Sequence, residues 1–135
     1  MKYKFLIILL LLCISGIARG AENFAGTYTT SIGVGDVPPE LKDAAGIWEI
    51  FIGEQNDFTA SKSGEVQVRG SYSIAGDQIT FVDNDGPMAC AKDQATGTYH
   101  AALDGDSLTF TKTDDACKAR SIVLTSHSLT RKKNH

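Results

Sequence analysis

Residues 70–81 read Gly70-Ser71-Tyr72-Ser73-Ile74-Ala75-Gly76-Asp77-Gln78-Ile79-Thr80-Phe81. Apolar and polar side chains alternate on both sides of Gly76-Asp77, and this period of two predicts strands with one buried and one solvated face. Glycine readily adopts the positive φ that tight hairpin turns require, and aspartate can hydrogen-bond to its own backbone there. The segment therefore predicts an antiparallel β-hairpin.

A second hairpin with the same construction follows in residues 97–110, where Gly105-Asp106 occupies the turn. Its expected inward residues are Tyr99, Ala101, Leu103, Leu108 and Phe110. Alternation also appears in three shorter runs, at Trp48, Ile50 and Ile52, at Val66 and Val68, and at Ile122 and Leu124. Repeated short alternating runs separated by Gly, Asp and Asn are typical of an all-β domain.

We predict eight strands, at residues 24–32, 47–53, 56–62, 65–75, 78–83, 97–103, 107–113 and 120–130. Residues 37–45, which follow Asp36 and include Pro38-Pro39, predict one short helix or 3₁₀ turn after the first strand. Eight antiparallel strands leave two edges, and pairing the first strand with the last hides both. The sequence thus favours an all-β, eight-stranded antiparallel up-and-down barrel, with a β-sandwich as the alternative.

The first 20 residues have the composition of a secretory signal peptide. Lys2 and Lys4 precede an apolar run from Phe5 to Ile14, and small residues stand near Gly20. The run is shorter than the roughly 20 residues that a membrane-spanning helix needs. We therefore expect a signal peptide at 1–20 and a single domain at 21–135, in a secreted or periplasmic protein without a membrane span.

Charge and cysteine content agree with that compartment. Removing residues 1–20 removes three of the 13 basic side chains and none of the 16 acidic ones, which leaves a net charge near −6. Nucleic acids and anionic membranes bind a surplus of Lys and Arg, so neither is expected as a partner. Cys13 falls in the signal segment, so Cys90 and Cys117 remain as the predicted disulfide of an oxidising compartment.

Several of these features resemble a known family. The opening Phe24-Ala25-Gly26-Thr27-Tyr28, the short helix, the hairpin meander and the closing Asp115-x-Cys117-x-x-Arg120-x-x-x-Leu124 resemble the small bacterial lipocalin-like proteins of the calycin group. Tyr28 stands where lipocalins usually carry Trp. The resemblance implies an eight-stranded barrel with a mouth for an apolar ligand, and a basic residue, here Arg120 or Arg131, that lies over the aromatic ring at the closed end.

The sequence contains no pattern that indicates catalysis. His100 and His127 are out of phase with the apolar faces of their strands, so we expect both to face solvent. Asp83-Asn84-Asp85-Gly86 resembles part of a calcium loop, but alignment on Gly86 places Phe81 and Lys92 at ligand positions. We therefore expect a protein that is not an enzyme and has no cofactor and no metal site.

The remaining candidates for function are the apolar and aromatic side chains of the inner face. The predicted ligand-binding residues are Tyr28, Trp48, Ile50, Phe58, Tyr72, Phe81, Tyr99 and Phe110. Core packing is the alternative role for each of them. Tyr72, Tyr99 and Trp48 strengthen the binding interpretation as a set, because their polar atoms need a buried partner or water and a barrel mouth offers both.

Two functions of different class follow. In the first, a monomeric barrel holds a small apolar or amphipathic ligand; in the second, the barrel is filled and loops 53–57 and 84–96 bind another protein as an inhibitor or interaction partner. The volume of the internal cavity distinguishes them. Several hundred Å³ would favour the ligand carrier, in line with known ligand sites, whereas a solid interior would favour the interaction protein.

Overall fold

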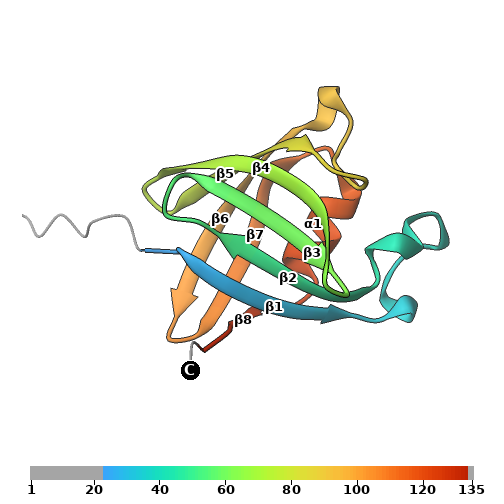
Figure 1. The fold of residues 1–135 in the computed structure, drawn as a ribbon, viewed down its shortest axis with the longest axis horizontal. Coiled ribbons are helices and arrows are strands. Elements are labelled where there is room, and N and C mark those ends of the chain that lie inside the picture. The colour runs from blue at the N-terminus through green and yellow to red at the C-terminus, as the bar shows by residue number, and fades with distance from the viewer. Residues whose placement is uncertain (1–22, 134–135) are drawn as a thin grey trace, which may run out of the picture.

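The computed structural model describes residues 23–133 as a closed antiparallel barrel, with the strands in the order β1 to β8 and each paired with its neighbours in sequence (Figure 1). The strands are β1 (Gly26–Ile32), β2 (Gly46–Ile52), β3 (Asp57–Lys62), β4 (Glu65–Ala75), β5 (Gln78–Asp85), β6 (Thr96–Asp104), β7 (Ser107–Asp115) and β8 (Leu129–Arg131). The predicted eight-stranded up-and-down barrel is confirmed. The predicted signal peptide, residues 1–20, lies outside the described residues.

The predicted strand at 120–130 is wrong. Its first part forms the helix α1 (Lys118–Thr125), and only β8 at its end is extended. The spacing of the buried side chains explains the difference, since Arg120, Val123 and Leu124 are three and four positions apart and share one face of a helix. Ile122 and Leu124, two positions apart, had suggested a strand.

The helix expected after the first strand consists of two 3₁₀ segments, η1 (Val34–Asp36) and η2 (Pro39–Ala44). A third, η3 (Lys92–Gln94), lies between β5 and β6. The one α-helix of residues 23–133 is instead α1, after β7. No helix in this range is long and apolar enough to cross a membrane.

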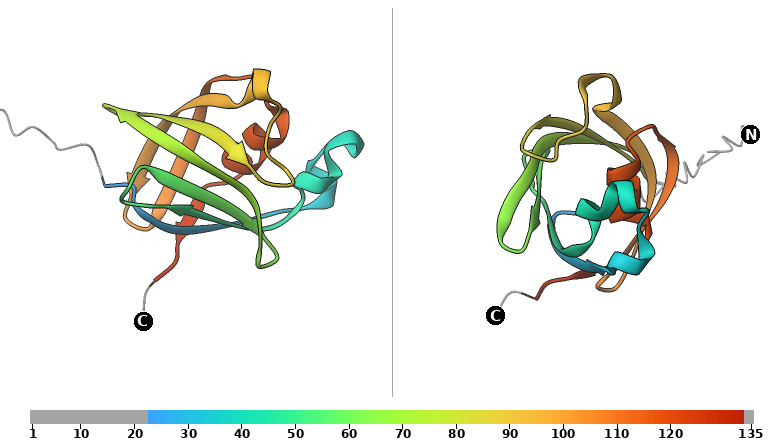
Figure 2. Two further views of the ribbon diagram at one scale, coloured as in Figure 1. Left: turned by 45° about the horizontal axis from the view of Figure 1, so that its top comes forward. Right: turned by 90° about the vertical axis from the view of Figure 1, so that its right-hand side faces the viewer.

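The two ends of the barrel differ. At the end where β1 begins, which we call the Arg131 end, β strands are joined by short turns. At the opposite end, the α1 end, the connections β1–β2, β5–β6 and β7–β8 contain η1, η2, η3 and α1, and β3 is joined to β4 by the short turn at residues 63–64. The view along the barrel shows η2 and α1 lying across the opening (Figure 2). The α1 end is therefore covered by helices.

Buried side chains fill most of the barrel interior. Tyr28, Ile52, Ile79, Tyr99, Leu108 and Leu129 each have an exposed fraction that rounds to zero. Phe81 lies at the centre of an aromatic cluster, with its ring 5.1 Å from that of Phe58, 6.2 Å from Tyr99 and 5.8 Å from Phe110, all in edge-to-face arrangements. Such contacts stabilise a core beyond simple burial of area, so much of the inner face serves packing.

Candidate functional site

A small cavity of about 50 Å³ lies inside the barrel toward the α1 end. It is lined by Trp48, Ile50, Phe58, Ala60, Val68, Phe81, Asp83, Met88, Cys90, Ala119, Arg120, Val123 and Leu124. Strands β2 to β5 form one wall, α1 forms another, and the connection after β5 contributes Met88 and Cys90. Apart from Asp83 and Arg120, these side chains are apolar or carry only sulfur or the indole N–H.

Four of the eight predicted ligand-binding residues line this cavity: Trp48, Ile50, Phe58 and Phe81. They come from β2, β3 and β5 and are buried. The other four, Tyr28, Tyr72, Tyr99 and Phe110, are buried in the barrel but are not among the lining residues. The structure thus places half of the predicted set around one space and the other half in the packed core.

The polar atoms of the buried aromatic residues have partners within the protein. Trp48 Nε1 donates to the carbonyl of Ala44 at 2.9 Å, and Tyr72 Oη donates to the carbonyl of Gly53 at 2.5 Å. Burial raises the pKa of Tyr72, and the carboxylates of Asp57 and Glu54 raise it further.

Tyr99 Oη donates to Asp115. Trp48, Tyr72 and Tyr99 therefore need neither a ligand nor water as a hydrogen-bond partner.

The side chain of Arg131 covers the Arg131 end of the barrel. Its guanidinium carbon lies 5.4 Å from the centre of the Tyr28 ring, a cation–π arrangement. Nη2 donates to Tyr28 Oη at 2.8 Å and to the carbonyls of Asn23 and Ala25 at 3.3 Å. Of the two basic residues considered for this position, Arg131 occupies it, and Arg120 has a different role.

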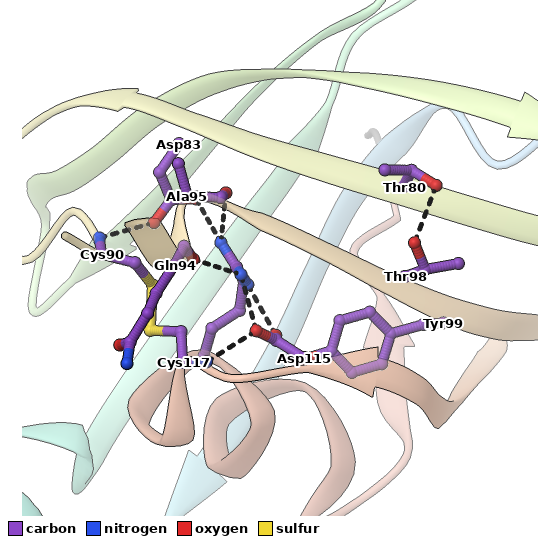
Figure 3. Close-up of polar contacts among 10 residues, drawn as sticks. Thr80, Asp83, Cys90, Gln94, Ala95, Thr98, Tyr99, Asp115 and Cys117 are labelled. Atoms are coloured by element: carbon purple, nitrogen blue, oxygen red, sulfur yellow. Dashed lines mark hydrogen bonds and ion pairs between the residues drawn. A yellow bond between two sulfur atoms is a disulfide. The ribbon is translucent and has the colours of Figure 1, made fainter. Parts of the chain in front are cut away.

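Arg120 extends from α1 into a buried ionic cluster with Asp83 and Asp115 at the edge of the cavity. Figure 3 shows the two acids of this cluster with Gln94 and Ala95 beside them. Arg120 pairs with Asp115 through two hydrogen bonds of 2.7 Å, from Nε and from Nη2. It also donates to the carbonyls of Ala95 and Gln94, at 2.8 Å and 3.0 Å. Through these bonds α1 is tied to β7 and to the connection that precedes β6.

The surroundings of Asp115 and Arg120 keep both side chains charged. Burial opposes ionisation of Asp115, but hydrogen bonds from Arg120, from Tyr99 and from the Cys117 N–H outweigh it and lower the pKa of Asp115 below its usual value. Burial likewise opposes the charge of Arg120, whose pKa is nevertheless raised by Asp115 and Asp83. The pKa of Tyr99 is raised, first by burial and then by its bond to Asp115. These groups stay in one protonation state near neutral pH.

Gly97 leaves room for this cluster. A Cβ at Gly97 would collide with the carboxylate of Asp115 and with the guanidinium of Arg120. The glycine is buried in β6. Its lack of a side chain lets the ion pair lie against the strand. The alternation of residues 97–110 does not predict this need for glycine at position 97.

The disulfide Cys90–Cys117 is present, as predicted from the sequence, with a Cα–Cα distance of 6.1 Å. Cys117 is the N-cap of α1, and Cys90 lines the cavity. The bond therefore attaches the beginning of α1 to the β5–β6 connection. Together with Arg120 it fixes the helix over the cavity.

Sequence reasoning missed the contribution of α1 and of the buried acid Asp83 to the cavity. From the sequence, Asp83 ends a predicted strand and is considered only as part of a possible calcium loop. In the structure it belongs to β5 and its side chain is only 2% exposed. Two signals were available. Asp83 continues the inward alternation of Ile79 and Phe81, and Ala119 and Val123 are four positions apart on one helical face.

Among residues 23–133 no group of three or more His, Cys, Asp or Glu side chains is arranged to hold a metal ion. His100 and His127 are both exposed. His100 faces outward from β6, as the alternation predicts, whereas His127 lies between α1 and β8 and not in a strand. No family model, no curated protein and no solved structure matches the chain. Any functional statement therefore has to rest on the barrel and its cavity.

Proposed function

We propose that this protein is an extracytoplasmic binding protein that holds a small apolar or amphipathic molecule in the cavity beneath α1. The observation that carries the proposal is a space inside the barrel surrounded almost entirely by apolar side chains, with Trp48, Phe58 and Phe81 among them. Ligand pockets of proteins are typically apolar with a few polar groups that fix orientation. This cavity has that composition, with Asp83 and Arg120 as the polar groups.

The size of the cavity limits the ligand. At about 50 Å³ it is several times smaller than the 300–1,000 Å³ of typical ligand sites. It exceeds the roughly 10–15 Å³ that a single water requires. A cavity that binds benzene measures about 150 Å³. We therefore propose a short alkyl chain, or a single ring that enters when the wall formed by α1 moves outward; the larger lipids that a wide barrel would admit do not fit.

The extracytoplasmic location rests on two features of the chain. The first 20 residues have the composition of a signal peptide, and Cys90 and Cys117 form a disulfide. Disulfides persist in oxidising compartments such as the periplasm and the extracellular space.

Fluorescence of Trp48 provides the test, because it is the only tryptophan and it lines the cavity. We expect one-ring compounds to change its emission in a saturable way. Ala119→Leu places extra carbon atoms in the cavity and should abolish that change, whereas Ala102→Leu, at an exposed position on β6, should not. No saturable response to toluene, benzyl alcohol or benzylamine would refute the proposal.

The alternative function, binding of another protein by a filled barrel, is favoured by the small volume of the cavity. The two loops proposed for it are at opposite ends of the barrel, however. Residues 53–57 connect β2 to β3 at the Arg131 end, and residues 84–96 include the connection from β5 to β6 at the α1 end. They cannot form one continuous surface, so this function would have to use one loop alone.

A further inference from the structure

One oxygen in the wall of the cavity lacks a hydrogen bond. Asp83 Oδ2 accepts the backbone N–H of Cys90 at 2.8 Å, but Oδ1 is buried and accepts no hydrogen bond. Arg120 Nη1 lies 3.1 Å from Oδ1, as an ion pair, while it directs a hydrogen bond to the carbonyl of Ala95. An ionised carboxylate has about four acceptor sites, so Asp83 retains unused capacity.

The charges of the cluster do not balance. Asp83 and Asp115 are two carboxylates beside one guanidinium, and Asp115 takes the bidentate pair with Arg120. Lys62 packs on Trp48, with Nζ 5.8 Å from the ring centre, but it donates its hydrogen bond to the carbonyl of Asp43. The cluster therefore has one negative charge in excess, located at Asp83 in the cavity wall.

We propose that the natural ligand is a small apolar amine that binds in its protonated form, with the ammonium group at Asp83 and the apolar body against Trp48, Phe58 and Phe81. This inference rests on the proposed binding function and specifies its ligand. A buried charge without a full partner is costly, and a charge-assisted hydrogen bond to a cation would supply the partner. The aromatic walls also attract a cation through their ring faces.

Reaching Asp83 requires a small adjustment of the wall. Oδ1 is buried in the structure, so the ammonium group makes contact only when the carboxylate turns toward the cavity. The hydrogen bond from the Cys90 N–H to Asp83 would change with it. The Cys90 amide therefore reports a change at Asp83 when an amine binds at the proposed position.

Three compounds that share a benzyl group separate the contributions: benzylamine, benzyl alcohol and toluene, titrated at pH 7 with Trp48 fluorescence as the signal. The amine offers a charge and donors, the alcohol a donor only, and toluene neither. We expect benzylamine to bind about tenfold or more tightly than toluene, with benzyl alcohol between them. Because Cys90 lines the cavity, its amide resonance should shift with either benzylamine or toluene, and the shift should be larger with benzylamine because the hydrogen bond to Asp83 also changes.

Substitution of Asp83 tests whether this residue causes the preference for an amine. Asp83→Asn should reduce the preference for amine over toluene to about one, whereas Asp85→Asn, which removes the same charge from an exposed side chain on the same strand, should retain it. If Asp83→Asn does not fold, the three-compound comparison and the Cys90 amide shift in the unmodified protein still test whether an ammonium group binds at Asp83. Equal binding of toluene and benzylamine would overturn the amine inference and leave the proposed function intact. Binding of none of the three would overturn both.

Discussion

The turns of the two main hairpins depend on single glycine residues. Gly76 has φ of 63° and Gly105 has φ of 59°, as the Gly-Asp pattern predicts. In neither case is there an atom within 4 Å of where a Cβ would be placed. Only the backbone conformation, and not the available space, therefore restricts these positions to glycine.

Gly105→Ala should lower the free energy of unfolding by about 1–2 kcal/mol, because an L-residue is strained at positive φ. Thermal unfolding followed by circular dichroism measures the effect. Gly35→Ala is the matched control, since Gly35 also has open space around it and does not adopt positive φ. Equal melting temperatures for the two variants would contradict the argument.

Some residues of the candidate site can be predicted from the sequence, because their burial follows from a local pattern. Trp48, Ile50, Phe58 and Phe81 follow from alternation along single strands, which is a local property. Arg120, by contrast, is buried because it meets Asp115 on β7 and Asp83 on β5, and those contacts depend on how distant segments are brought together. A local pattern does not contain that information, so it does not indicate that Asp83 belongs to a buried ionic cluster.

At the level of elements, α1 is the feature that most changes the interior. Val123 and Leu124 are buried and line the cavity, and Arg120 fixes the helix to β7. A strand at this position would have followed the barrel wall and left the α1 end without this cover. The sequence predicted seven of the eight strands within about two residues, since each has a regular alternation, but only the last part of the eighth.

Leu124→Ala should destabilise the protein by about 2–5 kcal/mol, the usual range for a buried leucine. The same change enlarges the cavity, so ligands larger than one ring should gain affinity in the variant. Chemical denaturation measures the first effect, and fluorescence of Trp48 the second. Lys118→Ala, at an exposed position of the same helix, should change neither. Unchanged stability of Leu124→Ala would show that α1 is not packed as described.

For the whole molecule, the ion pair between α1 and β7 makes the stability of the folded state depend on pH in the acid range. The pKa of Asp115 is lower in the folded protein than the ordinary value of 3.8. The folded state thus gains stability from the ionised carboxylate above about pH 4 and loses it as the pH falls through the folded pKa.

Urea denaturation between pH 3 and pH 7 tests this expectation. The free energy of unfolding should decrease below about pH 4, and Asp115→Asn should reduce that decrease, since the titrating group is removed. Asp114→Asn, an exposed neighbour, should keep it. The same acid dependence in the Asp115→Asn variant and the unmodified protein would assign the effect to other carboxylates.

Closure of the barrel depends on its shortest strand. β8 has three residues and pairs with β1 at two positions and with β7 at two positions. If β8 detaches, β1 and β7 become open sheet edges, and such edges are templates for pairing with another chain. Leu129, fully buried, and Arg131, bonded to Tyr28, are the contacts that oppose detachment.

Native-state hydrogen exchange would locate this opening, as faster exchange at Thr29 and Thr130 in Arg131→Ala than in the unmodified protein. Lys133→Ala, with its side chain 75% exposed, is the control and should exchange normally. Equal exchange in all three proteins would show that the strand is held by its backbone pairing alone. The barrel has its fewest paired residues at β8, so we expect detachment of residues 129–131 to expose the edges at which a second copy of the chain would pair.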